Sequence, residues 1–258
     1  MKSKQHQELF DLLEQKYLTF SQADFIENDP ILIPHRFSAK EDIEIAAFLT
    51  AIIAWGQRKT IINNANRMME IMDHSPADFI RNHEETDLKK TLGFVHRTFN
   101  ADDLMFFFTA LKDIYLNHGG LEKIFSNRSN SDMANRLSQF KQEFFNQEHL
   151  KRTEKHVADP MKGSTAKRIN MFLRWMVRTN KEGIDFGLWK SISPSELMLP
   201  LDIHTSTVGR YLGLLTRKQN DWKAVVEITD RLRTFDSKDP IKYDFALFGM
   251  GAIGKYES

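Results

Sequence analysis

Apolar residues recur at intervals of three and four along most of the chain, which is the spacing of one face of an α-helix. The clearest periodic stretches are 57–72, 102–116, 133–145, 203–215, 222–235 and 243–252. A denser run, 45–55, is apolar at every position except Thr50. A helix that is apolar all round is usually buried, so we expect 45–55 to form a helix enclosed on most sides.

Two of the predicted helices carry start signals. Ser38 stands three residues before Glu41, which is the spacing of a capping box, and predicts that a helix begins there. Pro76 follows Ser75, and proline is favoured in the first turn of a helix, so a short helix is expected to begin at this point.

Strand patterns are weak. The apolar run 31–33 is too short for a convincing strand and ends at Pro34. The segment 182–201 is the longest without clean periodicity and contains two glycines and two prolines, so we predict an ordered loop with one short helix near 193–196. Together these patterns predict an all-α fold.

Composition limits the classes of protein. A chain of 258 residues is long enough for two helical lobes, and its net charge of +1 leaves any nucleic-acid surface to local clusters. The absence of cysteine excludes disulfides, thiolate metal sites and cysteine-bound iron–sulfur clusters. The longest apolar run is far shorter than the roughly 20 residues that cross a bilayer, and no secretory signal follows the N-terminus. A cytoplasmic protein without a membrane segment is therefore expected.

The first candidate segment for chemistry is the turn 162–164 and the helix that follows it. Lys162, Gly163 and Ser164 form a glycine turn that leads into a helix, where backbone N–H groups can bind an anion; Ser164 or Thr165 can instead cap that helix. The window 151–181 holds nine lysines and arginines against two acidic residues. Such a basic stripe, which includes Arg174 and Arg178, is expected of a surface that contacts phosphates.

Lys167 falls within the first turn of this helix. The helix dipole and the nearby basic residues both disfavour a cation there and favour the neutral amine that a Schiff-base nucleophile requires. Taken alone, this segment is better explained by Lys167 as an ordinary solvated lysine than by Lys167 as a nucleophile.

The second candidate segment places Asp202 at the start of the helix 203–215, directly after Pro200 and Leu201. Its simplest role is an N-cap, which is worth about 1 kcal/mol. A fixed carboxylate can also stabilise positive charge at a sugar C1′. His35 and His204 have no partner at metal-ligand spacing, and no glycine-rich nucleotide loop occurs, so we expect no metal and no cofactor.

The two segments together resemble the helix-hairpin-helix DNA glycosylase superfamily, which has a lysine helix after a hairpin and an aspartate that opens a later helix. The whole chain, from about Asp42 onward, also looks like a little-characterised bacterial family assigned to that superfamily. It departs from the usual pattern in three ways: Gly163 is the only hairpin glycine left, 35 residues separate Lys167 from Asp202, and the iron–sulfur cysteines are missing. The long spacing is similar in kind to the archaeal 8-oxoguanine branch. The strings that match the superfamily are 167–173, 201–205 and 208–214, and the run 46–51 is similar to its first barrel helix. The strings shared with the bacterial family are 170–176, 200–205 and 242–249.

The resemblance implies a fold, a reaction and a set of roles. It implies two helical lobes, 38–190 and 1–37 with 200–258, in one compact unit with a central cleft. Lys167 would attack C1′ of a nucleotide flipped from double-stranded DNA, and Asp202 would stabilise the sugar cation. The other implied positions are Lys162, Gly163, Ser164 and Arg168 on phosphates, and Trp55, Gln57 and Asp244 in the base pocket or as a wedge.

The expected function is therefore a base-excision DNA glycosylase with AP lyase activity, acting as a monomer on an oxidised base, with 8-oxoguanine as the expected lesion. Two alternatives stay open. The first is a non-catalytic DNA- or RNA-binding module of the same fold. The second is a helical protein-interaction scaffold, which would lack the steep salt dependence that phosphate contacts confer on DNA binding.

Overall fold

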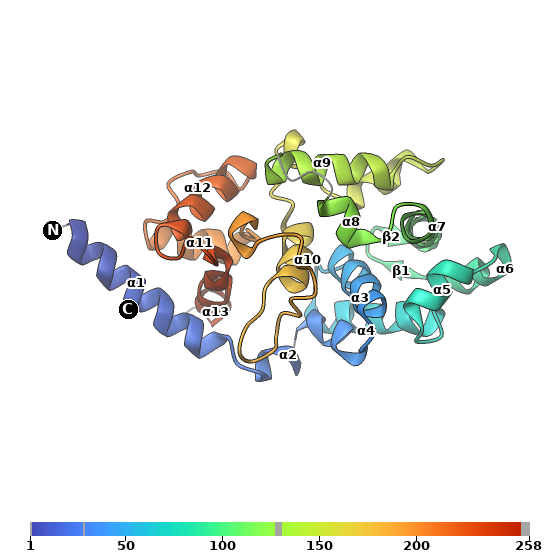
Figure 1. Ribbon diagram of the computed structural model, residues 1–258, viewed down its shortest axis with the longest axis horizontal. Helices are drawn as coiled ribbons and strands as arrows, with labels where there is room; N and C mark the ends of the chain where they lie inside the picture. Colours follow the sequence, from blue (N-terminus) through green and yellow to red (C-terminus); the bar gives the residue numbers. More distant parts are fainter. Residues whose placement is uncertain (1, 28, 127–130, 254–258) are drawn as a thin grey trace. The chain divides into compact units, whose positions relative to one another are not determined.

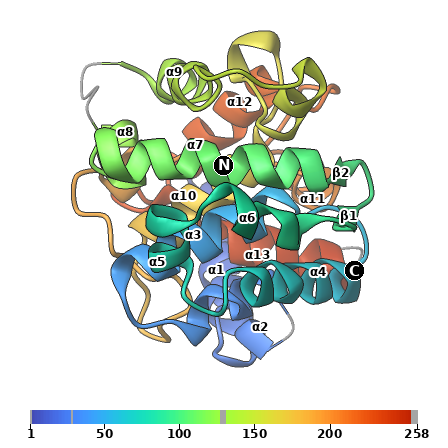
Figure 2. The ribbon, with the colours of Figure 1, turned by 90° about the vertical axis from the view of Figure 1, so that its right-hand side faces the viewer.

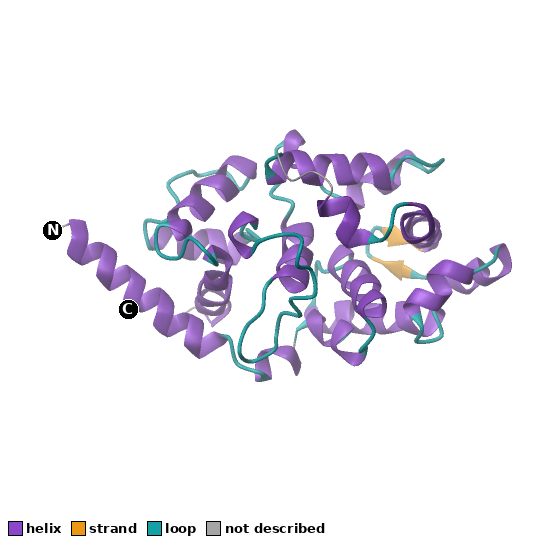
Figure 3. Cartoon of the chain, viewed as in Figure 1, coloured by secondary structure: helices purple, strands orange, loops and turns teal. Residues whose placement is uncertain are grey.

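The computed structural model describes residues 2–27, 29–126 and 131–253 (Figure 1). Most of them are helical, which confirms the all-α prediction, and Figure 3 shows long purple helices joined by teal loops. The chain divides into two compact units, Met1–Phe25 with Asp159–Ser258 as unit 1 and Ile26–Ala158 as unit 2. This division differs from the predicted lobes, because the lysine helix belongs to the same unit as the aspartate helix. The central cleft expected between the lobes stays a prediction.

Unit 2 is built around one buried helix. Its α-helices are α3 (Lys40–Ile52), α4 (Arg58–Ile71), α5 (Pro76–Asn82), α6 (Glu85–Leu88), α7 (Ala101–Asn117), α8 (Leu121–Ser126) and α9 (Met133–Phe144). Its 3₁₀ helices are η1 (Pro30–Leu32), η2 (Pro34–Arg36), η3 (Lys89–Thr91) and η4 (Lys151–His156), while α2 (Asp24–Glu27) spans the boundary between the units. Every α3 residue from Ile43 to Ile52 is buried, as the apolar run predicts.

Aromatic rings fill the core of unit 2. The Phe48 ring of α3 lies 6.1 Å from Phe107 of α7 and 5.8 Å from Phe140 of α9, and Phe107 lies 4.8 Å from Phe144. Aromatic pairs at these separations contribute beyond the area that they bury. These contacts join α7 and α9 to α3.

The predicted capping box at Ser38 is wrong. Ala39 is the N-cap of α3 and makes no side-chain cap bond. The Glu41 carboxylate accepts instead from the Arg81 guanidinium of α5, at 2.7 Å from Nη2. A bidentate pair with arginine is a stronger contact for a carboxylate than a backbone N–H at a helix start.

A small hairpin was not predicted. Strands β1 (Val95–His96) and β2 (Phe99–Asn100) pair antiparallel just before α7, as Figure 2 shows. Arg97 at the turn has φ of +57°, a left-handed conformation. Strands of two residues give no alternating pattern in a sequence, so their periodicity could not be detected.

Unit 1 contains the long N-terminal helix and the C-terminal helices. Its α-helices are α1 (Lys2–Phe20), α10 (Lys167–Val177), α11 (Ile203–Tyr211), α12 (Trp222–Arg233) and α13 (Asp244–Ile253). Its 3₁₀ helices are η5 (Pro160–Lys162), η6 (Pro194–Glu196) and η7 (Pro240–Tyr243). Helix η6 confirms the short helix predicted within 182–201.

Glycines allow close helix contacts in unit 1. A Cβ on Gly251 of α13 would lie 2.9 Å from Cβ of His204 in α11. A Cβ on Gly209 of α11 would lie 2.6 Å from Cδ1 of Ile228 in α12. Helices α11, α12 and α13, red and orange in Figure 1, therefore pack as one group.

The long loop between α10 and α11 is ordered, as predicted. Its backbone bonds to the end of α10, with Phe186 N donating to Trp175 O at 2.8 Å and Trp189 N to Met176 O at 2.9 Å. These bonds satisfy carbonyls that a helix end otherwise leaves without partners. The Trp189 ring is buried and lies edge-on to Phe172 of α10, at 5.3 Å.

Candidate functional site

Lys167 is the first residue of α10. The residue before it, Ala166, is the N-cap, with φ of +48°, and makes no side-chain cap bond. A left-handed conformation is unfavourable for a residue with a Cβ and occurs often at functional sites. Ser164 does not cap α10; its Oγ accepts from Ala166 N at 3.2 Å.

The turn before α10 uses its backbone donors internally. The N–H groups of Lys162 and Ser164 donate to Asp159 O, at 3.1 and 3.3 Å, and Gly163 N donates to Pro160 O at 2.8 Å. The turn is fixed to α12 through Trp222 N, which donates to Gly163 O at 3.2 Å. These three N–H groups therefore do not form the anion cradle that the glycine turn suggests, although the Lys162 side chain is exposed.

Asp202 is the N-cap of α11. Its Oδ1 accepts from His204 N at 2.9 Å and from Thr205 N at 3.0 Å. Thr205 Oγ1 in turn accepts from Asp202 N at 2.9 Å, which completes a capping box. The capping role predicted from the sequence is confirmed, and it engages only one of the two carboxylate oxygens.

The second oxygen faces the lysine. Nζ of Lys167 lies 3.9 Å from Oδ2 of Asp202, and the two side chains keep 28% and 22% of their surface exposed. The structure therefore brings together a partly exposed amine and a partly exposed carboxylate from two helix starts. An accessible amine next to a fixed anion can add to an electrophilic carbon while the anion stabilises the positive charge that develops.

The predicted basic stripe is wrong for Arg174 and Arg178, because both are buried. Arg174 donates to Asp244, and its Nε lies 3.3 Å from Oδ1 of Asp185. Arg178 donates to Asp185 and, through Nε at 2.7 Å, to Asp239. Their acidic partners follow the window 151–181 in the sequence, so a charge count within that window overstates the exposed positive charge by these two arginines.

Asp244 is buried and paired with an arginine. Its carboxylate is 5% exposed at the start of α13 and accepts from Arg174. Burial raises the pKa of Asp244 to about 6, which the nearby Arg174 charge counteracts and the Asp202 charge increases. The predicted base contact of Asp244 stays a prediction, and the residue is electrostatically coupled to the Lys167–Asp202 pair.

Arg168 follows Lys167 on α10 and is partly buried. Burial lowers the pKa of the Arg168 guanidinium to about 10, which still leaves it charged at neutral pH. Its predicted contact with phosphate stays a prediction.

Trp55 and Gln57 belong to unit 2, whereas Lys167 and Asp202 belong to unit 1. The Trp55 ring lies edge-on to His96 at 4.9 Å and stacks near His156 at 5.9 Å. Gln57 is the exposed N-cap of α4 and makes no side-chain cap bond. Their predicted roles toward a base stay predictions.

Sequence reasoning missed the contacts of buried Asp103 in unit 2. Its Oδ1 accepts from Thr153 Oγ1 at 2.7 Å, and its Oδ2 lies 3.2 Å from His156 Nε2 and 3.0 Å from Arg152 Nη1. Asp103 also closes the capping box of α7. Only that local role has a sequence signal, since the other partners lie about fifty residues away.

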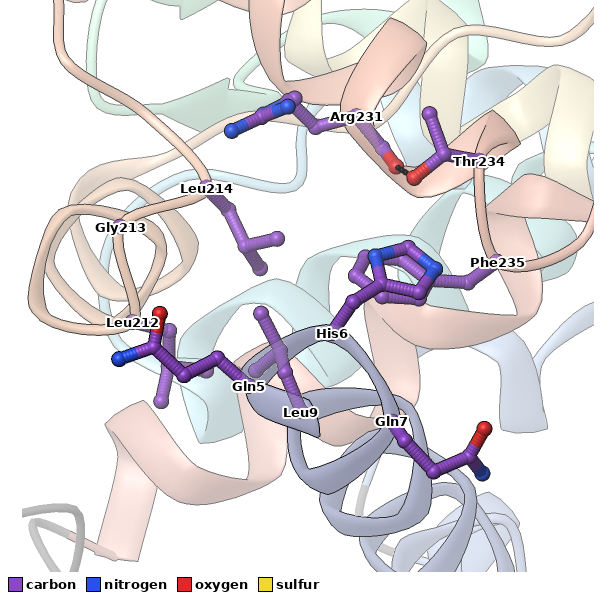
Figure 4. Close-up of a pocket in the computed structure, with 10 residues that line it drawn as sticks. All are labelled: Gln5, His6, Gln7, Leu9, Leu212, Gly213, Leu214, Arg231, Thr234 and Phe235. Carbon is purple, nitrogen blue, oxygen red and sulfur yellow. Dashed lines mark hydrogen bonds between the residues drawn. The ribbon is translucent and has the colours of Figure 1, made fainter. Parts of the chain in front are cut away.

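A groove of about 860 Å³ lies elsewhere in unit 1, between the start of α1 and the ends of α11 and α12 (Figure 4). Its walls include His6, stacked on Phe235 at 4.5 Å, with Arg231 and Leu214 on the other sides. Neither Lys167 nor Asp202 lines it. The described residues contain no group of three or more His, Cys, Asp or Glu able to hold a metal ion. Within the same residues, no helix is long and apolar enough to cross a membrane.

Comparison with protein families places the chain in one of them. The family described as "Protein of unknown function (DUF2400)" matches residues 29–253, most of the chain. The chain therefore belongs to this family. No match was found among curated proteins or among solved structures.

The family match overturns the predicted assignment to the helix-hairpin-helix DNA glycosylase superfamily, since no such family matched. The strings behind that assignment have a local explanation. A capping aspartate and a turn before a helix are common solutions to the chemistry of helix starts, so short strings that contain them are weak evidence of kinship.

Proposed function

We propose that this protein is a DNA N-glycosylase with AP lyase activity, in which Lys167 is the nucleophile. The observation that carries the proposal is the 3.9 Å separation between Nζ of Lys167 and Oδ2 of Asp202. Both groups are partly exposed, and Oδ1 of the same aspartate is fixed by the start of α11. An anion held in this way needs no reorganisation when positive charge develops beside it.

The reaction can be written with these two side chains. Nζ of Lys167 forms a bond to C1′, and the bond from C1′ to the base breaks, with its electron pair leaving on the base. The proton that the ammonium must lose reaches the departing base through Oδ2 of Asp202. Ring opening then gives a protonated Schiff base, and removal of a C2′ proton expels the 3′ phosphate. The target nucleotide has to be extruded from the duplex first, since C1′ is otherwise inaccessible.

Double-stranded DNA with a flipped damaged nucleotide is the proposed partner. An oxidised base, with 8-oxoguanine first, is the lesion to try. An abasic site is the more direct probe, because it already offers the aldehyde to an amine. Lys162, exposed next to the turn, is the proposed phosphate contact of this unit.

Borohydride trapping tests the proposal. The full chain is incubated with abasic and 8-oxoguanine duplexes, reduced and resolved by denaturing electrophoresis. A covalent adduct is expected that disappears in Lys167→Gln and persists in Lys223→Gln, a matched change at an exposed lysine of the same unit. If wild-type protein binds DNA but forms no adduct on any lesion, the non-catalytic module is the better description. An adduct that persists in Lys167→Gln would assign the chemistry to another amine and overturn the proposal.

A further inference from the structure

A linear network of charged side chains runs through unit 1. It consists of five groups of alternating sign, and each is in contact with the next: Asp239, Arg178, Asp185, Arg174 and Asp244. Four of them, Arg178, Asp185, Arg174 and Asp244, are buried, and the Asp239 side chain at one end keeps 26% of its surface exposed. Two guanidiniums face three carboxylates, so the full set carries one negative charge too many when all are ionised.

Burying an uncompensated charge is costly, and the usual response is for one group to become neutral. Asp244 is the carboxylate of this network that can take up a proton with the least loss of contacts. It accepts from Arg174 through one oxygen, whereas Asp185 lies between two arginines. Asp239, at the other end of the network, is partly exposed and accepts from Arg178 through both oxygens. One proton on Asp244 makes this network of five charged groups electrically neutral.

The same residue lies on the face of α13 that meets the aspartate helix. Asp244, Phe248 and Gly251 are spaced four and three residues apart, so they share one helix face. Phe248 lies edge-on to the His204 ring at 6.0 Å, and a Cβ on Gly251 would lie 3.0 Å from His204 O. His204 is two residues after Asp202, and Asp244 is electrostatically coupled to both Asp202 and Lys167.

We propose that Asp244 is a positioning residue for the Lys167–Asp202 pair, which sets the charge beside Lys167 by gaining or losing one proton. With Asp244 neutral, Asp202 is the anion that acts on the lysine. With Asp244 ionised, a second negative charge adds to it and favours the ammonium over the reactive amine. The inference deepens the proposed function and rests on it for its meaning.

Lys167, Arg174 and Asp202 act directly on Asp244. Other titratable or charged groups lie on the elements packed near it: Arg178 at the end of α10, Asp185 in the following loop, His204 on α11, Asp239 and Lys242 of the η7 segment, and Tyr17 of α1, which packs against Phe245. Arg174 is the one whose hydrogen bond holds the carboxylate in place.

The test measures the reactivity of the Lys167 amine without DNA. The full chain is methylated with formaldehyde and a mild reductant at pH 5 and pH 7.5, and the Lys167 peptide is followed by mass spectrometry. In Asp244→Asn, which keeps the shape and the acceptor oxygen, we expect an unchanged rate at pH 5. At pH 7.5 we expect modification to be about fivefold faster than in wild type, because one nearby negative charge is gone.

Asp230→Asn is the matched control, because it removes the same charge from an exposed side chain of unit 1 outside the buried network. It should leave the modification rate relative to wild type unchanged at both pH values. The inference is overturned if the rate of Asp244→Asn relative to wild type is the same at pH 5 and pH 7.5, or if Asp230→Asn has an equal effect. If Asp244→Asn does not fold, a carboxyl-carbon NMR titration of wild-type protein decides. An aspartate that titrates near pH 6 supports the inference, and none above about pH 5 refutes it. Failure of the proposed function is recognised separately, as wild-type protein that forms no borohydride adduct with DNA.

Discussion

Asp202 caps α11 with Oδ1 while its Oδ2 lies 3.9 Å from Nζ of Lys167. The two roles use different oxygens of one carboxylate and can be separated by substitution. Stability depends on the acceptor at the helix start, whereas the proposed chemistry depends on the negative charge.

Asp202→Asn should keep the cap and lose the chemistry, since asparagine is as good an N-cap as aspartate. Asp202→Ala should lose both and lower the free energy of unfolding by about 1 kcal/mol. We expect either change to slow formation of the borohydride adduct about 100-fold or more. Urea unfolding and adduct rates measure the two effects.

The control is Asp221→Asn, at the N-cap of α12, which should leave the rate of adduct formation unchanged. If Asp202→Asn forms the adduct at the wild-type rate, Asp202 has only a structural role.

The buried arginine of α10 should be essential for stability. Arg174→Leu leaves Asp185 and Asp244 buried without their shared partner, and removing one member of such a network typically costs about 3 to 5 kcal/mol. Lys90→Leu, which removes the exposed ion pair of Lys90 with Asp73, should change the free energy of unfolding far less than Arg174→Leu. Equilibrium urea unfolding of both variants gives the comparison. A similar small loss in both would mean that the buried network contributes little.

The free energy of unfolding should decrease as the pH rises, because Asp244 loses its proton. Burial raises its pKa in the folded state from the usual 3.8 to about 6, so the folded protein binds this proton more tightly than the unfolded chain. The resulting stabilisation is complete below about pH 3.8, is lost as the pH rises toward 6, and is absent above it. The free energy of unfolding of wild type, minus that of Asp244→Asn, should therefore drop by about 2 to 3 kcal/mol between pH 4 and pH 7.

Denaturant unfolding at several pH values checks this trend, with tryptophan fluorescence as the signal because Trp175 and Trp189 are buried. Asp11→Asn, on the exposed face of α1, is the control and should give a difference from wild type that does not vary in this way. Parallel curves for wild type and Asp244→Asn would show that Asp244 does not hold a proton in the folded state.

Helices and their approximate limits could be predicted from the sequence, because their cause is local. The periodicity of 102–116 and 133–145 corresponds to α7 and α9 within one or two residues. Serine and proline next to a polar residue also located η6 correctly. The capping oxygen of Asp202 is another local feature, and it too was predicted.

Contacts between distant segments could not be predicted. The partners of Arg174 and Arg178 lie up to 70 residues away, so a count of charges within one window mistook a buried ion network for a basic surface. A helix with its polar side chains also buried gives the same sequence pattern as an amphipathic one. The same limitation applies to Asp244: its hydrogen bond with Arg174, 70 residues away, could not be predicted from the sequence.

Gly251 offers a way to move the aspartate without changing any charged group. In Gly251→Ala the new Cβ would lie 2.9 Å from Cβ of His204 and 3.0 Å from its carbonyl oxygen, so the start of α11 must shift. A displacement near 1 Å at a reacting group can cost about 100-fold in rate, so we expect adduct formation to fall about 10- to 100-fold. Overpacking should also lower the free energy of unfolding by about 1 to 3 kcal/mol.

Gly209→Ala is the matched control. Its Cβ would meet Ile228 of α12, and Gly209 lies farther along α11 from Asp202. We expect a comparable loss of stability with little change in the rate of adduct formation. Equal losses of rate in both variants would attribute the effect to stability and contradict a role for the exact placement of Asp202.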